Sequence, residues 1–98
     1  MTFTKRLHEP IQRGEVTCSV RIWMHPRVKV GGRYRLGPGF VEVTALTEID
    51  LADVTPELAR RSGFAGRDEL LATARHGRGE RVFLVDFVYQ PEGERGGG

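Results

Sequence analysis

The sequence has few of the features that would assign it to a specialised class of protein. It holds one cysteine, Cys18, in 98 residues, which excludes an internal disulfide and favours a reducing compartment. Its apolar runs are shorter than the ~18 residues that span a bilayer. No apolar segment follows Lys5 and Arg6, so nothing resembles a secretory signal. We therefore expect a single-domain, cytoplasmic protein without a membrane partner.

Signatures of metal and phosphate-loop sites are lacking as well. The three histidines, His8, His25 and His76, do not lie at the spacing of metal ligands, and a lone cysteine completes no zinc pattern. The glycine-rich stretch 31–39 lacks the lysine and the following helix of a phosphate-binding loop. We expect neither a metal nor a cofactor.

Lysine is scarce, and arginine takes its place. Lys5 and Lys29 are the only lysines among 15 basic residues, and the formal net charge is +2. The planar guanidinium suits phosphate and stacks on bases, although the codon usage of a GC-rich genome would produce the same bias. A nucleic-acid site in this chain would therefore need a local basic patch, with the acidic residues placed elsewhere.

The segment 14–23 alternates between apolar and polar side chains, which is typical of a half-buried strand. Its even-numbered residues from 16 to 22 are apolar and would pack on the core. Thr17, Ser19 and Arg21 would form a polar row on the opposite face, with Trp23 at its far end. Because hydroxyls and a guanidinium can offer hydrogen bonds to a ligand, we expect the functional site along this row.

The remaining segments are typical of short strands and helices. The final strand is apolar on both faces apart from Asp86, so it should be central or close a barrel. The expected helices are 3–13, kinked or split at Pro10, then 56–62 and 68–75, ended by Gly63 and Gly77. The expected strands are 16–23, 28–30, 33–36, 41–45 and 82–89. The residues thus predict an α+β fold, mostly β, over 1–90, with a disordered C-terminal tail over 91–98.

A family resemblance lies in the same central segment. Gly14, Val16, Ser19 and Arg21 occupy the positions of a motif Gly-x-Lys-x-x-Thr-x-Arg, and with them the chain resembles the ASCH domains (activating-signal-cointegrator homology). Serine replaces the motif's threonine, and valine replaces its lysine. The order of VKVGGRYRL, VEVTALTEIDLADVT, ELARRSGF and ERVFLVDF extends the resemblance over residues 3–89. It implies a small PUA-like β-barrel with two or three short helices, as in RNA-binding proteins.

The preferred hypothesis is an ASCH-type RNA-binding module that recognises single-stranded or modified RNA, or a nucleotide. Its cleft would be centred on GEVTCSVR. Arg21 would hold a phosphate or carboxylate, Trp23 and Tyr34 would stack on bases, and further arginines would track the backbone. The expected binding residues are Arg21, Thr17, Ser19, Trp23, Tyr34, Arg33, Arg35, Arg60 and Arg61.

Two other classes of function stay open. Some ASCH proteins are amidohydrolases of N4-acetylcytidine, with the motif's lysine and threonine and a helical glutamate as proposed machinery, and ribonuclease activity is the related alternative. Here Val16 cannot take a proton, and residues 61–62 lie where the glutamate is expected, with Glu57 and Glu69 nearby. Ser19 is the remaining candidate catalytic residue, and loss of a base costs ~10²–10⁴ in rate. The third class is a protein-interaction domain.

Each candidate residue also has a purely structural interpretation. Arg21 would pair with an acid such as Asp86 across the barrel, because a buried carboxylate needs a partner. Trp23 and Tyr34 would be core or barrel-end residues. Residues 60–61 would be an ordinary solvated helix face.

Overall fold

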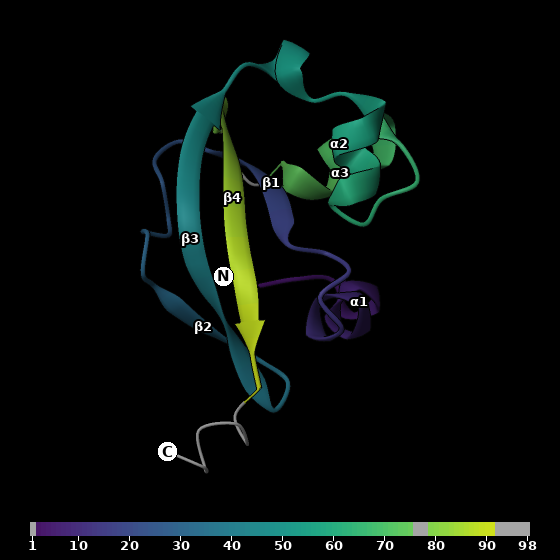
Figure 1. The fold of residues 1–98 in the computed structure, drawn as a ribbon. Helices are drawn as coiled ribbons and strands as arrows, with labels where there is room; N and C mark the ends of the chain where they lie inside the picture. The colour runs from purple at the N-terminus through teal and green to yellow at the C-terminus, as the bar shows by residue number, and fades with distance from the viewer. Residues whose placement is uncertain (1, 76–78, 92–98) are drawn as a thin grey trace.

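A curled sheet of four antiparallel strands forms the centre of the molecule, which is described by a computed structural model over residues 2–75 and 79–91 (Figure 1). The strand order is β1-β4-β3-β2, so β1 and β2 are the two edges of a half-barrel. The strands are β1 (Cys18–Trp23), β2 (Arg33–Leu36), β3 (Gly39–Ile49) and β4 (Arg81–Gln90). The helices are η1 (Lys5–Leu7), α1 (His8–Gln12), η2 (Leu51–Asp53), α2 (Pro56–Arg61) and α3 (Arg67–Ala74). The predicted α+β fold, mostly β, is confirmed.

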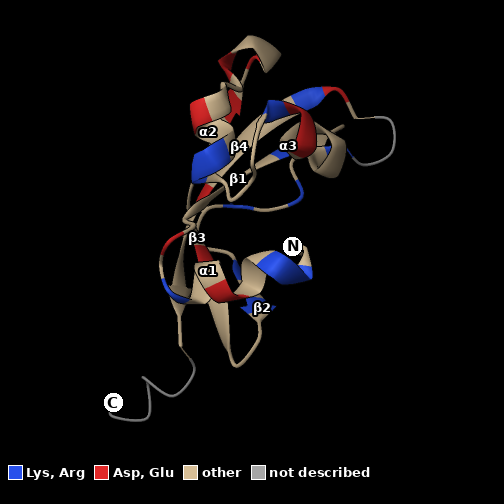
Figure 2. Cartoon of the chain, turned by 90° about the vertical axis from the view of Figure 1, so that its right-hand side faces the viewer, with Lys and Arg blue, Asp and Glu red and all other residues tan. Residues whose placement is uncertain are grey.

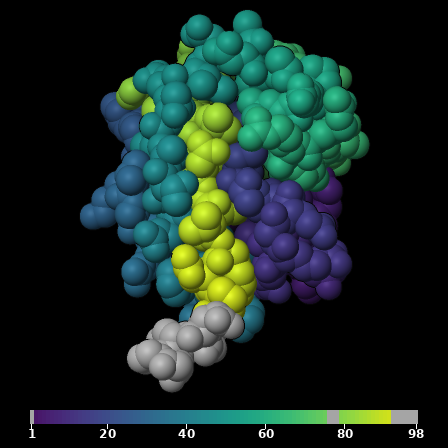
Figure 3. Space-filling model, in the orientation of Figure 1, coloured from purple at the N-terminus to yellow at the C-terminus, as the bar shows by residue number. Residues whose placement is uncertain are grey.

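β4 is a central strand, as its apolar character on both faces predicted. It pairs with β1 on one side and with β3 on the other. Its odd-numbered residues Phe83, Val85 and Phe87 are buried, and Val85 is not exposed at all. Its even-numbered side chains change character along the strand, from buried Val82 to exposed Val88. Figure 3 shows the exposed part as a strip between β3 and the amino-terminal part of the chain.

α2 and the amino-terminal residues 2–4 cover the two faces of β1, so its polar row is not the open surface that was expected. The register places Cys18 opposite Asp86 and Ser19 opposite Val85, which assigns odd and even positions to opposite faces. α2 covers the even face, where Ser62 Oγ lies 3.5 Å from Cys18 Sγ. Residues 2–4 cover the odd face through Phe3, whose ring packs edge-on against Phe87 at 5.4 Å. All six residues of β1 are buried.

The predicted helix signals in the second half of the chain are confirmed. The Thr55 hydroxyl accepts a hydrogen bond from Leu58 N at 3.1 Å, and Pro56 occupies the first helical position of α2. Gly63, with φ at 94°, follows the last turn in the left-handed region. α3 buries Leu70 and Ala74. The expected stop of that helix, residue 77, lies outside the described residues.

Several predicted boundaries were wrong. The first helix is split between η1 and α1, not at Pro10, which lies in the first turn of α1, where the lack of an N–H costs no hydrogen bond. Residues 28–30 form no strand, and Val30 is 61% exposed. β3 continues to Ile49 through a register shift between Val43 and Ala45, which is a β-bulge. The expected disordered tail lies, from residue 92 on, outside the described residues.

Candidate functional site

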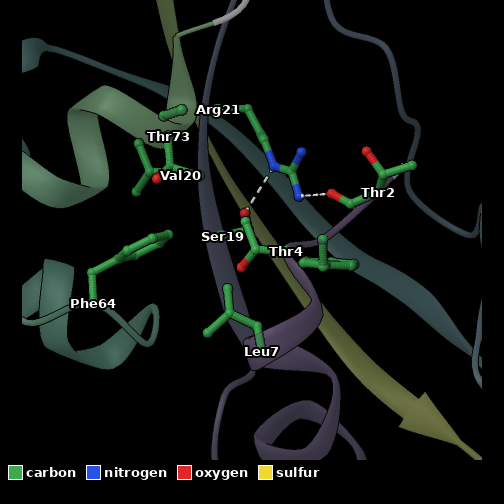
Figure 4. Close-up of a pocket in the computed structure, with 10 residues that line it drawn as sticks. Thr2, Thr4, Leu7, Ser19, Val20, Arg21, Phe64 and Thr73 are labelled. Atoms are coloured by element: carbon green, nitrogen blue, oxygen red, sulfur yellow. Dashed lines mark hydrogen bonds between the residues drawn. The ribbon is translucent and has the colours of Figure 1, made fainter.

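A pocket of about 210 Å³ lies along the free edge of β1 (Figure 4). Among the described residues, β1 meets only the isolated bridge between Ile22 and Arg75 on this side, so most of the edge has no strand neighbour. Residues 2–4 and η1 form one wall of the pocket, and the α2–α3 connection with the end of α3 forms the other. The described lining residues are Thr2, Phe3, Thr4, Leu7, Ser19, Val20, Arg21, Phe64, Thr73 and Ala74.

Within the described part of the chain, the contacts that hold the Arg21 guanidinium come from neutral groups. Its Nε donates to Ser19 Oγ at 2.9 Å, and its Nη2 donates to the Thr2 carbonyl oxygen at 2.6 Å (Figure 4). Its Cζ lies 5.0 Å from the centroid of the Phe3 ring, a cation–π contact. No further hydrogen bond joins Nη1 to a described residue. The guanidinium therefore retains donor capacity beside the pocket.

No carboxylate lies in ion-pair contact with Arg21 within the ranges that the structure describes. The expected pair with Asp86 does not form, because Asp86 is opposite Cys18 and thus on the other face of the sheet. Arg21 is 8% exposed, and burial lowers its pKa from its ordinary value to about 10. The pocket is lined by a buried cation with no counter-ion in the described chain.

The pocket is equipped for binding more than for hydrolysis. None of the described lining residues carries a carboxylate, an imidazole or an amine that could take a proton. The Ser19 hydroxyl accepts a hydrogen bond from Arg21 Nε, and no side chain able to act as a base is hydrogen-bonded to it among the described residues. Val16, at the motif's lysine position, is buried and is not among the described lining residues. The lining combines a cation, hydroxyls and two phenyl rings.

The other predicted residues near this strand lie away from the pocket. Thr17 is exposed and precedes β1. Trp23 is 4% exposed and packs against Phe83 with ring centroids 5.9 Å apart, so it is a core residue and offers no stacking surface. Tyr34 is half-buried on β2, and its hydroxyl covers Gly32. The alternative interpretation of Trp23, as a residue of the core, is therefore the correct one.

The predicted arginines are distributed over separate elements. Arg33 and Arg35 lie on β2, at the opposite edge of the sheet from β1. Arg33 Nε is 3.5 Å from Glu42 Oε1, and its guanidinium lies over the Phe40 ring. Residues 60–61 are exposed on α2. Figure 2 shows basic and acidic positions on several elements of the chain, and Arg33 and Arg35 lie at the edge of the sheet opposite Arg21.

Sequence reasoning missed both walls of the pocket. Phe3 was expected in the helix 3–13, but it lies ahead of η1 and contacts Arg21. Phe64 and Thr73 come from the α2–α3 connection and from α3. Arg6 ties the two walls together, because its Nη1 donates to the Gly63 carbonyl at 3.2 Å and its guanidinium lies over Phe64. No local spacing joins these segments, so no sequence signal could have found them.

The described residues contain no cluster of three or more histidine, cysteine, aspartate or glutamate side chains able to hold a metal ion. No helix in the same ranges has the length and apolar character needed to cross a membrane. Comparison with protein families, curated proteins and solved structures gives no match for this chain.

Proposed function

We propose that this domain is an ASCH-type RNA-binding module whose pocket at the β1 edge holds one nucleotide of a single-stranded or modified RNA. The buried Arg21 guanidinium, without a carboxylate partner in the described chain, carries the proposal. Burying an ion costs several kcal/mol unless it is compensated. A phosphate or a base carbonyl oxygen would supply the missing acceptor, because guanidinium donors bind such oxygens strongly.

The size and lining of the pocket support a single nucleotide as its occupant. About 210 Å³ is less than the ~300–1,000 Å³ typical of pockets for drug-sized ligands. Phe3 and Phe64 provide apolar walls against which a base could pack, a contact worth about 1–3 kcal/mol in single-strand binders. The hydroxyls of Ser19 and Thr73 provide polar partners for base edges. The motif position of Arg21 agrees with this assignment.

The proposal is tested by the affinity of an Arg21→Met variant for a fluorescein-labelled single-stranded RNA, measured by fluorescence anisotropy. Methionine keeps much of the length of the side chain and removes the charge and the donors. We expect binding to weaken about 10- to 100-fold, which corresponds to the ~1.5–3 kcal/mol of a charge-assisted hydrogen bond.

Arg13→Met is the matched control. It makes the same change of net charge at an exposed site whose guanidinium lies 3.5 Å from Glu9 and Glu15. We expect this control to bind within twofold of the wild type. Equal affinity of Arg21→Met and wild type would refute the pocket as the RNA site.

A further inference from the structure

The loop between β1 and β2 presents basic side chains without acidic partners. His25, Arg27 and Lys29 are exposed, and no ion pair or side-chain hydrogen bond joins them to any other residue that the structure describes. Several other exposed arginines are compensated by carboxylates. Those pairs are Arg6–Glu69, Arg13–Glu9, Arg13–Glu15, Arg33–Glu42 and Arg81–Glu48.

The loop and the pocket share a stretch of sequence that carries positive charge alone. Residues 16–41 contain no aspartate and no glutamate, although the chain has 13 acidic residues. The basic residues of this stretch are Arg21, Arg27, Lys29, Arg33 and Arg35. Within this stretch, Arg21, Arg27 and Lys29 pair with no carboxylate of the described chain, so the segment from the pocket to the loop has a local excess of positive charge, which is what attraction of a polyanion requires.

We propose that residues 24–32, here named the basic loop, bind the phosphate backbone of the RNA strand whose nucleotide occupies the β1 pocket. This inference rests on the proposed function and extends it from one nucleotide to the path of the strand. Phosphate contacts from lysine and arginine position a nucleic acid without reading its sequence. The basic loop therefore supplies affinity, and the pocket supplies selectivity.

The position of the basic loop is fixed relative to the pocket. β1 passes directly from Arg21, in the pocket, to Met24, at the start of the loop. At ~3.3 Å per strand residue, Met24 lies ~10 Å along the chain from Arg21, and Arg27 and Lys29 follow it on the path of the loop toward β3. The loop is attached at both ends, because Arg81 Nη1 donates to the Met24 carbonyl at 3.4 Å and Gly31 N donates to the Val43 carbonyl at 2.7 Å.

The core also determines which side chains of the basic loop face outward. Val28 is 7% exposed and belongs to the hydrophobic core, whereas Arg27 and Lys29 on either side of it are exposed. Exposed Met24 and Val30 add apolar surface beside these cations, where the sugar or base faces of a nucleic acid could pack. The loop thus presents two cations on a segment that is anchored at both ends and in its middle.

The test compares a double variant, Arg27→Ala with Lys29→Ala, with a matched double variant, Arg60→Ala with Arg61→Ala, which removes two exposed arginines from α2. The affinity of each double variant for the labelled single-stranded RNA is measured over a range of salt concentrations. We expect the loop variant to bind about tenfold more weakly and to lower the slope of log K against log salt by about 1.4, because each phosphate contact contributes ~0.7 on single strands. The α2 variant should keep the wild-type slope.

The outcomes separate this inference from the proposed function. An unchanged slope and affinity in the loop variant, together with weakened binding by Arg21→Met, would overturn the basic loop and leave the pocket intact. Full binding by Arg21→Met with loss in the loop variant would refute the pocket and therefore the shared path of the strand. If the wild type bound vesicles of anionic lipid and not RNA, and the loop variant lost that binding, the loop would belong to a membrane-binding surface and the proposal would fail.

Discussion

At the scale of single residues, the cost of burying the Arg21 cation opposes the contacts that the cation makes. Its two protein hydrogen bonds have a charged donor and contribute about 1.5–3 kcal/mol each, and the contact with Phe3 adds about 0.5–2 kcal/mol. The desolvation of an ion costs several kcal/mol, so it offsets most or all of these gains. Because folding lowers the pKa of Arg21 to about 10, the unfolded chain holds this proton more tightly, and the penalty applies at every pH below that value.

Replacing Arg21 by methionine is therefore expected to leave the free energy of unfolding unchanged or to raise it by about 1–2 kcal/mol, whereas the proposed RNA binding should weaken. Urea denaturation followed by circular dichroism measures the difference through the transition midpoint. Loss of more than ~1 kcal/mol would mean that the hydrogen bonds to Ser19 and Thr2 outweigh desolvation. Arg21 would then be a structural residue.

The sequence indicated Ser19 and Arg21 as site residues, but not their burial. Alternation along a strand assigns side chains to two faces, and it says nothing about which distant segment covers a face. Here the cover is Thr2 and Phe3, which precede the strand by a helical segment and contact it only in the folded state. Trp23 was misplaced as a binding residue for the same reason, since its burial depends on Phe83 of β4.

At the scale of elements, helix boundaries were predicted where the signal is local chemistry. Thr55 and Pro56 begin α2, and Gly63 follows its end, because capping and the left-handed backbone depend on neighbouring residues alone. The bulge between Val43 and Ala45 was not predicted, since it depends on the register with β4. β3 is also longer than the expected strand 41–45, because its pairing with β4 continues to Ile49.

Gly63 joins α2 to the amino-terminal wall of the pocket, which makes it a sensitive test of this arrangement. A Cβ added there would lie 2.5 Å from Leu7 Cδ2 on a backbone with φ at +94°, so both strain and contact oppose it. We expect Gly63→Ala to lower the free energy of unfolding by about 1–3 kcal/mol. The midpoint of thermal unfolding measures this loss.

Gly66→Ala serves as the control for that substitution. A Cβ at Gly66 would meet no atom within 4 Å, and the backbone there is extended. We expect a smaller loss, of about 0.5–1 kcal/mol, from this change at the N-cap of α3, where glycine is preferred to alanine. Equal effects of the two substitutions would show that neither the left-handed backbone nor the contact with Leu7 limits stability.

At the scale of the whole molecule, one hydrophobic core joins the sheet to all three α-helices. Ile11 of α1, Leu58 of α2 and Leu70 of α3 belong to the same cluster of buried residues as Val85 at the centre of the sheet. The fold class could be predicted because alternation and turn residues are repeated along the chain. The half-barrel shape could not be predicted, because it depends on which strands have a neighbour on one side only, here β1 and β2.

Cys18 allows the integrity of this core to be measured with one reagent. Its thiol is 2% exposed and lies between the sheet and α2. We expect a disulfide-exchange reagent such as DTNB to leave the native protein unlabelled over minutes and to label one thiol per chain in concentrated guanidinium chloride. Rapid labelling without denaturant would mean that α2 opens independently of the sheet.

The contact between Thr2 and Arg21 has a practical consequence for recombinant work. Any purification handle fused ahead of Thr2 would begin directly beside the guanidinium and would compete with an incoming ligand for space. The opposite end is the safer place for a handle, because β4 continues past Val85, the neighbour of Ser19, and carries the chain away to Gln90. Residues added beside Thr2 are therefore expected to lower the affinity that is measured for a ligand of the pocket.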